Sequence, residues 1–315
     1  MASLDEQLTA YLSDAHALEQ QALPQMRAAP DMAGDPELAA AFRAHLAETE
    51  RHEQLTRERL EARGGSTSKV KEAIFKAGGF GFVLFAKTQP DTPGKLLAHA
   101  LSYEHLELAA YDLLLRVADR AGDAETAAIA RAIREDERSM SDRLEASYDR
   151  ALDASKTGDL DKYLADAHAI EAQSIGLLEK GPTLAGSGEL ARVYSEHLEQ
   201  SRGHQRLIAD RLEARGSSPS ALKDAAMRLG ALNWGGFFAA QPDTPAKLAA
   251  FAYAFEFLET AGYELLERVA RREGDADTAV LAERIIADER GMARRLSEHF
   301  DAALDASLDA QEVHA

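Results

Sequence analysis

The chain has 315 residues, with 54 Asp and Glu against 36 Lys and Arg, so its formal net charge is −18. This acidic balance argues against a nucleic-acid partner and against docking on an anionic membrane, because both need clustered Lys and Arg. Cysteine is absent, which excludes disulfides, thiolate metal sites and a cysteine nucleophile. The first residues lack an export signal, and no apolar run approaches the roughly 20 residues of a membrane helix. We therefore expect a cytoplasmic protein.

The sequence consists of two copies of one unit, related by a constant shift of 152 residues. YLSDAHALEQQ at 11–21 aligns with YLADAHAIEAQ at 163–173, and RLEARG and QPDTP each occur twice at the same spacing. So long a period indicates a tandem domain duplication and not a solenoid. The predicted parts are a first domain over 1–155, a second over 156–307 and a C-terminal tail over 308–315.

Each copy predicts four helices, which in the first copy lie near 4–28, 36–63, 94–120 and 123–153. These segments are rich in Ala, Leu, Glu, Arg and Gln, with Pro mainly at their edges. Pro24 is the exception, and we expect it to end or kink the first helix. The second and third helices are joined by a long connection over 64–92, whereas the other connections are short. We predict an all-α fold of two tandem four-helix bundles, each with one long crossover, which is the ferritin-like arrangement.

Several carboxylates fall on the apolar faces of these helices, where a core is expected. At 100° per residue, Glu104 lies at the centre of the apolar stripe of the third helix, and Glu137 lies within that of the fourth. Tyr111 and Tyr263 are expected to pack with their hydroxyls bonded to a carboxylate. The candidate metal ligands of the first copy are His16, Glu19, His45, Glu48, His52, Glu104, Glu107 and Glu137. Those of the second copy are His168, Glu171, His197, His204, Glu256, Glu259 and Glu289.

An unpaired ionised carboxylate in a core is costly, so such groups become protonated, pair with a cation or bind a metal. Arg134 is spaced to pair with Glu137, but its counterpart is Ile286, so this pairing does not serve both copies. A bound divalent or trivalent metal is the simplest compensation for carboxylates together with imidazoles, and ferritin-like bundles hold carboxylate-bridged pairs of iron or manganese. The alternative is a protonated or Arg-paired network that is the relic of a metal site.

Five segments of the first copy carry a family resemblance: DAH at 14–16, ALPQM at 22–26, HLAET at 45–49, EHLELAAY at 104–111 and DE at 136–137. They resemble the YciE/YciF-type ferritin-like family of small bacterial stress-associated proteins. The resemblance implies a rubrerythrin-like bundle, a di-metal site and a dimer, which the two halves would supply as an intramolecular pseudo-dimer. The chain departs from the family in having His16 where such relatives tend to have Glu. It also lacks the Glu-x-x-His motif.

These patterns predict a ferritin-like protein that binds iron or manganese at a mono- or di-metal site, and the resemblance implies a part in stress responses or in iron and oxygen chemistry. The alternative is a metal-free helical scaffold, or a stress-protective interaction protein, with a degenerate site. No catalytic residue is assigned.

Overall fold

The structure is a computed structural model. It describes residues 3–66, 92–155, 158–221, 223–225, 227–228 and 243–311. Every regular element in these ranges is a helix, and none of them is long and apolar enough to cross a membrane. The described residues form two compact units, one up to residue 155 and the other from 158 onward. Most of each predicted crossover lies outside the described residues.

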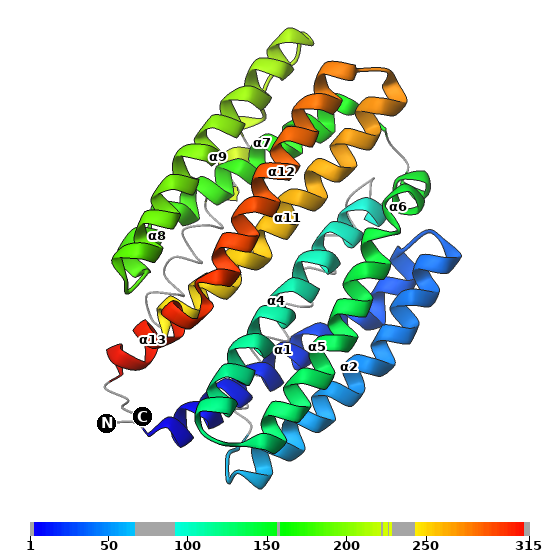
Figure 1. The fold of residues 1–315 in the computed structure, drawn as a ribbon. Helices are drawn as coiled ribbons and strands as arrows, with labels where there is room; N and C mark the ends of the chain where they lie inside the picture. The colour runs from blue at the N-terminus through cyan, green and yellow to red at the C-terminus, as the bar shows by residue number, and fades with distance from the viewer. Residues whose placement is uncertain are drawn as a thin grey trace. The chain divides into compact units, whose positions relative to one another are not determined.

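In the first unit, four long helices run side by side (Figure 1). They are α1 (Leu4–Met32), α2 (Pro36–Ala62), α4 (Thr92–Arg120) and α5 (Ala124–Glu145), and the short α6 (Tyr148–Ala154) follows. Helix α1 packs against α2 and α4, and α5 packs against the same two helices. The four helices therefore enclose a single core.

The second unit repeats this arrangement. Its helices are α7 (Leu160–Leu178), α8 (Gly181–Leu184), α9 (Gly188–Ala214), α11 (Thr244–Glu273), α12 (Ala276–Glu298) and α13 (Phe300–Ala310). Helix α7 packs against α9 and α11, and α12 packs against the same two helices. The prediction of an all-α fold with tandem helical bundles is confirmed.

The turn between α1 and α2 shows how the sequence sets a helix boundary. Gly34 has a φ of 68°, and a Cβ added there would lie 3.0 Å from the Cβ of Ala154, so the turn requires glycine. The next residue, Asp35, accepts hydrogen bonds from the backbone N–H of Glu37 and Leu38 at 2.9 Å. Helix α2 therefore begins at a capped position.

Two predicted helix boundaries differ from the structure. Helix α1 extends past the predicted end at residue 28 to Met32 and does not end at Pro24, because buried residues on both sides of the proline, Leu23 and Met26, pack into the core. This packing outweighs the one backbone hydrogen bond that proline removes. The predicted helix over 123–153 is divided into α5 and α6, where the Ser147 hydroxyl donates to the carbonyl of Arg143 at 2.7 Å.

An arginine cluster ties the end of α2 to the beginning of α5. Arg59 Nη2 lies 2.6 Å from Asp123 Oδ2, and Arg63 also pairs with Asp123. Asp123 in turn caps α5 by accepting from the backbone N–H of Thr126 at 3.0 Å. The second unit has the same cluster, formed by Arg211, Arg215, Asp275 and Thr278. One end of each bundle is thus fixed by the same polar contacts.

We expect Asp123→Ala to lower the free energy of unfolding of the first unit by about 1–3 kcal/mol, because it removes a helix cap and the partner of two arginines. Chemical denaturation measures this change. The control is Asp119→Ala, which loses only an exposed contact with Arg131 and should shift stability by less than about 0.5 kcal/mol. Equal stabilities of the two variants would contradict the role given to Asp123.

Candidate metal centre

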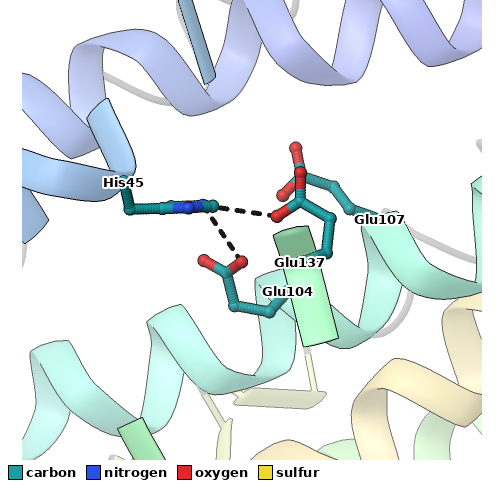
Figure 2. A group of neighbouring side chains, drawn as sticks. All are labelled: His45, Glu104, Glu107 and Glu137. Carbon is teal, nitrogen blue, oxygen red and sulfur yellow. Dashed lines mark ion pairs between the residues drawn. The ribbon is translucent and has the colours of Figure 1, made fainter. Parts of the chain in front are cut away.

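Four side chains from three helices meet in the core of the first unit. They are His45 from α2, Glu104 and Glu107 from α4, and Glu137 from α5, and they point toward one another (Figure 2). All four are buried, and one ligand atom of each lies within 4.8 Å of the others. His45 Nε2 is 3.1 Å from Glu104 Oε2 and 3.3 Å from Glu137 Oε2. Imidazole nitrogen and carboxylate oxygen in one buried group are donors that first-row metal ions prefer.

A second group adjoins the first and shares one residue with it. Glu19 from α1, His52 from α2 and Glu137 also bring ligand atoms within 4.8 Å of one another. His52 Nδ1 is 2.8 Å from Glu137 Oε1 and 3.9 Å from Glu19 Oε1. Glu137 therefore directs one oxygen toward each imidazole. A carboxylate shared by two donor groups is the arrangement expected of a carboxylate-bridged metal pair.

Helical spacing accounts for how the chain assembles these groups. His45 and His52 are seven residues apart on α2, so they lie on one face two turns apart. Glu104 and Glu107 are three residues apart on α4 and share a face in the same way. Glu19 and Glu137 enter from α1 and α5, so every long helix of the bundle contributes a donor.

Counted together, the two groups of the first unit contain four carboxylates and two imidazoles. Di-iron and di-manganese bundles use the same donor set, taken from one Glu on each of two helices and a Glu-x-x-His motif on each of the other two. Here both imidazoles come from α2. The missing motif therefore changes which helix supplies the imidazoles and leaves the number of donors unchanged.

The second unit builds the same two groups. The first consists of His197, Glu256, Glu259 and Glu289, and the second of Glu171, His204 and Glu289. His197 Nε2 is 3.1 Å from Glu256 Oε1, and His204 Nδ1 is 2.8 Å from Glu289 Oε1. Glu289 is thus the shared carboxylate, at the position equivalent to Glu137.

Three of the predicted ligands lie outside these groups. His16 Nδ1 is 3.4 Å from the Thr56 hydroxyl, and its Nε2 is 3.9 Å from Glu53. His168 Nδ1 is instead 3.0 Å from Asp224 Oδ1. Glu48 is hydrogen-bonded to Nδ1 of His45, whereas the grouped carboxylates face Nε2 of the same ring. The position of Glu48 is therefore that of a residue that orients a ligand.

The structure also shows supporting residues around the groups. Asp136, which the sequence analysis did not select as a candidate, lies 3.1 Å from Nε2 of His52, and Asp288 is 3.2 Å from Nε2 of His204. The Asp-Glu pair, which is repeated in both copies, was the sequence signal that could have indicated these two aspartates. The Tyr111 hydroxyl donates to Glu19 at 2.5 Å, and the Tyr263 hydroxyl donates to its counterpart in the second unit at 2.6 Å, so the prediction for both tyrosines is confirmed.

The arginine pairing considered from the sequence does not form. Arg134 Nη2 lies 2.9 Å from Asp112 Oδ1 on α4. Among the described residues, every ion-pair partner of the grouped carboxylates is a histidine. Both oxygens of Glu104 and of Glu137 are buried without a hydrogen bond of normal geometry from the described residues. Such oxygens must be protonated or must bind a cation.

A family described as "Domain of unknown function (DUF892)" matches two segments of the chain, residues 3–156 and 159–309. The chain belongs to this family. Its two DUF892 domains lie in tandem, and the family is ferritin-like, in agreement with the helical bundles and their buried donor groups. The narrower resemblance to the YciE/YciF-type proteins stays a prediction.

The two DUF892 domains differ in what borders the donor groups. In the first, the Tyr103 hydroxyl donates to the backbone carbonyl of Leu18 at 2.9 Å, close to the groups. Its counterpart in the second domain is Phe255, which packs with Leu177. A small cavity of about 20 Å³ lies there and is bordered by Glu256. At this position a hydroxyl in one domain is thus replaced by an apolar ring in the other.

In the donor groups of the first DUF892 domain, the imidazoles and the carboxylates shift one another's pKa values. Burial raises the pKa of Glu19 and of Glu104 to about 8. Although burial opposes it, contacts with His45 and His52 hold the pKa of Glu137 well below its usual range. Burial also opposes the charge of His52, yet Glu137 and Glu19 raise its pKa to about 9. Without metal, protons therefore occupy the groups at neutral pH.

We expect the metal-free protein to lose stability as the pH rises from 6.5 to 9. The folded state raises the pKa of Glu104 from 4.5 to about 8 and that of His52 from 6.5 to about 9, so it holds protons that the unfolded chain has released. For each such proton, the free energy of unfolding falls by about 1.4 kcal/mol for every unit by which the pH increases. Glu137, with its lowered pKa, contributes the opposite slope only at acidic pH.

Urea unfolding in the presence of a chelator, at pH 6.5 and at pH 9, measures this dependence. Glu104→Gln combined with Glu256→Gln removes two of the ionising groups and should flatten the slope. Stability that stays constant or increases over this range in the unaltered protein would show that the groups do not hold protons in the folded state.

Proposed function

We propose that each DUF892 domain binds a carboxylate-bridged pair of iron or manganese ions in the core of its bundle. The observation that carries the proposal is the place of Glu137, with one oxygen toward His45 and the other toward His52. Each imidazole also faces a carboxylate of its own, Glu104 or Glu19. The donor set is the one that carboxylate-bridged metal pairs use in ferritin-like bundles.

The way the grouped carboxylates are satisfied favours metal over a purely structural role, because their ion-pair partners among the described residues are all histidines. A core that needed only a stable polar network would satisfy its carboxylates with arginine or with hydrogen-bond donors. Here Arg134 on α5, which is spaced to pair with Glu137, contacts Asp112 instead. Bound metal ions would replace the protons that the imidazoles and carboxylates hold, and would coordinate the oxygens of Glu104 and of Glu137 that lack a hydrogen bond of normal geometry from the described residues.

Iron or manganese at this position would supply redox chemistry toward oxygen or peroxide. The residues of the chain hold the donors in place: Asp136 fixes the ring of His52, and the Tyr111 hydroxyl fixes one oxygen of Glu19. We therefore propose a role in iron and oxygen chemistry, and the resemblance to stress-associated proteins extends this proposal to stress responses.

The second candidate function is a metal-free helical scaffold that protects or binds other proteins. The observation that favours it is the raised pKa of Glu19, Glu104 and His52, because protons alone then hold the cluster together at neutral pH. The two candidates differ in a measurable property, which is the metal content of the protein.

After anaerobic incubation with Fe²⁺ or Mn²⁺ and removal of excess metal, we expect about four ions per chain, two in each bundle. Glu137→Ala combined with Glu289→Ala removes both shared carboxylates and should abolish most of this binding. Elemental analysis measures the metal. The control is Glu135→Ala, whose side chain is 79% exposed on the same helix and whose counterpart in the second domain is already Ala287.

Two results would sink the proposed function. One is an unaltered chain that retains no metal, which the metal-free scaffold predicts. The other is a double variant that retains as much metal as the Glu135→Ala control, which would place the ions elsewhere.

Metal binding should also release protons, because the ligands of the metal-free groups carry them at neutral pH. Calorimetric titration with Mn²⁺ at pH 7, in two buffers with different ionisation enthalpies, measures the number released. We expect more than one proton per chain, and an affinity that rises as the pH increases toward 9. Binding heats that do not depend on the buffer would show that the groups hold no exchangeable protons.

A further inference from the structure

In each domain, one ligand imidazole has a hydrogen-bond acceptor on the ring nitrogen that faces away from the grouped carboxylates. This acceptor differs between the two domains. Nε2 of His45 faces the grouped carboxylates, and Nδ1 of the same ring is 2.9 Å from Glu48 Oε2. In the second domain, Nδ1 of His197 is 3.3 Å from Gln200 Oε1. Both contacts are made by Nδ1 with a residue three positions later on the helix, but the acceptor changes from a charged carboxylate to a neutral amide.

The other imidazole has an aspartate as its acceptor in both domains. Nε2 of His52 lies 3.1 Å from Asp136, and Nε2 of His204 lies 3.2 Å from Asp288. A carboxylate is therefore the acceptor on the outer ring nitrogen of three of the four imidazoles, and His197 is the exception. The difference between the domains, as far as these acceptors are concerned, is confined to one position.

The acceptor behind a ligand histidine affects how strongly that histidine binds a cation. An Nδ1–H bonded to a carboxylate fixes the tautomer that leaves Nε2 free, and the negative charge makes the ring a better donor. An amide oxygen fixes the tautomer but adds no charge. Arg143 lies 3.6 Å from the other oxygen of Glu48, and because that arginine side chain is 36% exposed, water screens its effect on the carboxylate.

We propose that Glu48 and Gln200 make the two metal sites unequal, so that the ion beside His45 is held more tightly than the ion beside His197. This inference rests on the proposed function. The site beside His45 then fills before the site beside His197 as metal becomes available. One chain thus combines a site that stays loaded with a site that responds to the metal concentration.

Titration of the metal-free chain with Mn²⁺, with free Mn²⁺ followed by electron paramagnetic resonance, tests this order. In the unaltered chain, the site beside His45 should belong to a tight class and the site beside His197 to a weak class. Glu48→Gln should weaken the tight class about 10- to 100-fold, toward the weak one. Gln200→Glu should strengthen the weak class by a similar factor. The two variants therefore move the curve in opposite directions.

The chain offers a matched control in Glu53→Gln. Glu53 is also replaced by glutamine in the second copy, as Gln205, and lies on the same helix as Glu48. Its side chain is 16% exposed, against 22% for Glu48, and it accepts a hydrogen bond from Gln20 at 2.6 Å. Glu53 is not the acceptor of any grouped imidazole. The same change of charge should therefore leave the Mn²⁺ affinity of both classes of sites unchanged.

The outcomes separate this inference from the proposed function. If Mn²⁺ binds but Glu48→Gln and Gln200→Glu both titrate like the Glu53→Gln control, the inference is overturned and the metal site stands. If the unaltered chain binds no Mn²⁺ and no Fe²⁺, both are overturned.

Discussion

The contact of Glu137 with His45 and His52 determines how the rest of the first bundle is organised. This carboxylate is buried between two imidazoles, and four helices must pack in register to bring the other donors beside it. A charge in such a place is tolerated only with a compensating charge nearby. Protons provide that compensation in the metal-free protein, and metal ions would provide it in the loaded one. The second bundle obeys the same constraint around Glu289.

The sequence predicted the parts of this arrangement that depend on direction around a helix. The constant repeat indicated two domains, and the helical wheel placed Glu104 and Glu137 inside the core, where the structure has them buried. The wheel does not report depth along the bundle. His16 faces the core, yet it lies beside Thr56, one turn past His52 on α2, because the register between α1 and α2 is set by tertiary packing.

The same limit explains two other differences. Pro24 was expected to end or kink the first helix, but α1 does not end there, and core packing on both sides of that residue accompanies its continuation. Asp136 was not selected as a candidate because it lies beside the inward-facing Glu137 and reaches its partner, His52, across the gap to the neighbouring helix. Contacts between helices decided both cases, and a pattern within one helix does not contain them.

Duplication gives the chain two versions of one site with different surroundings. The donors themselves repeat, whereas Glu48 becomes Gln200 and Tyr103 becomes Phe255. Substitutions behind and beside the donors tune a metal site without dismantling it. The family described as a domain of unknown function thus contains, in this chain, two bundles with a common core chemistry and distinct outer residues.

The most direct test of the central claim is an anomalous-difference map from crystals of the full chain loaded with Mn²⁺, measured near the manganese absorption edge. The account predicts two peaks in each bundle, one on each side of Glu137 and one on each side of Glu289. A map with no peak among the grouped carboxylates, from protein at saturating Mn²⁺, would contradict it.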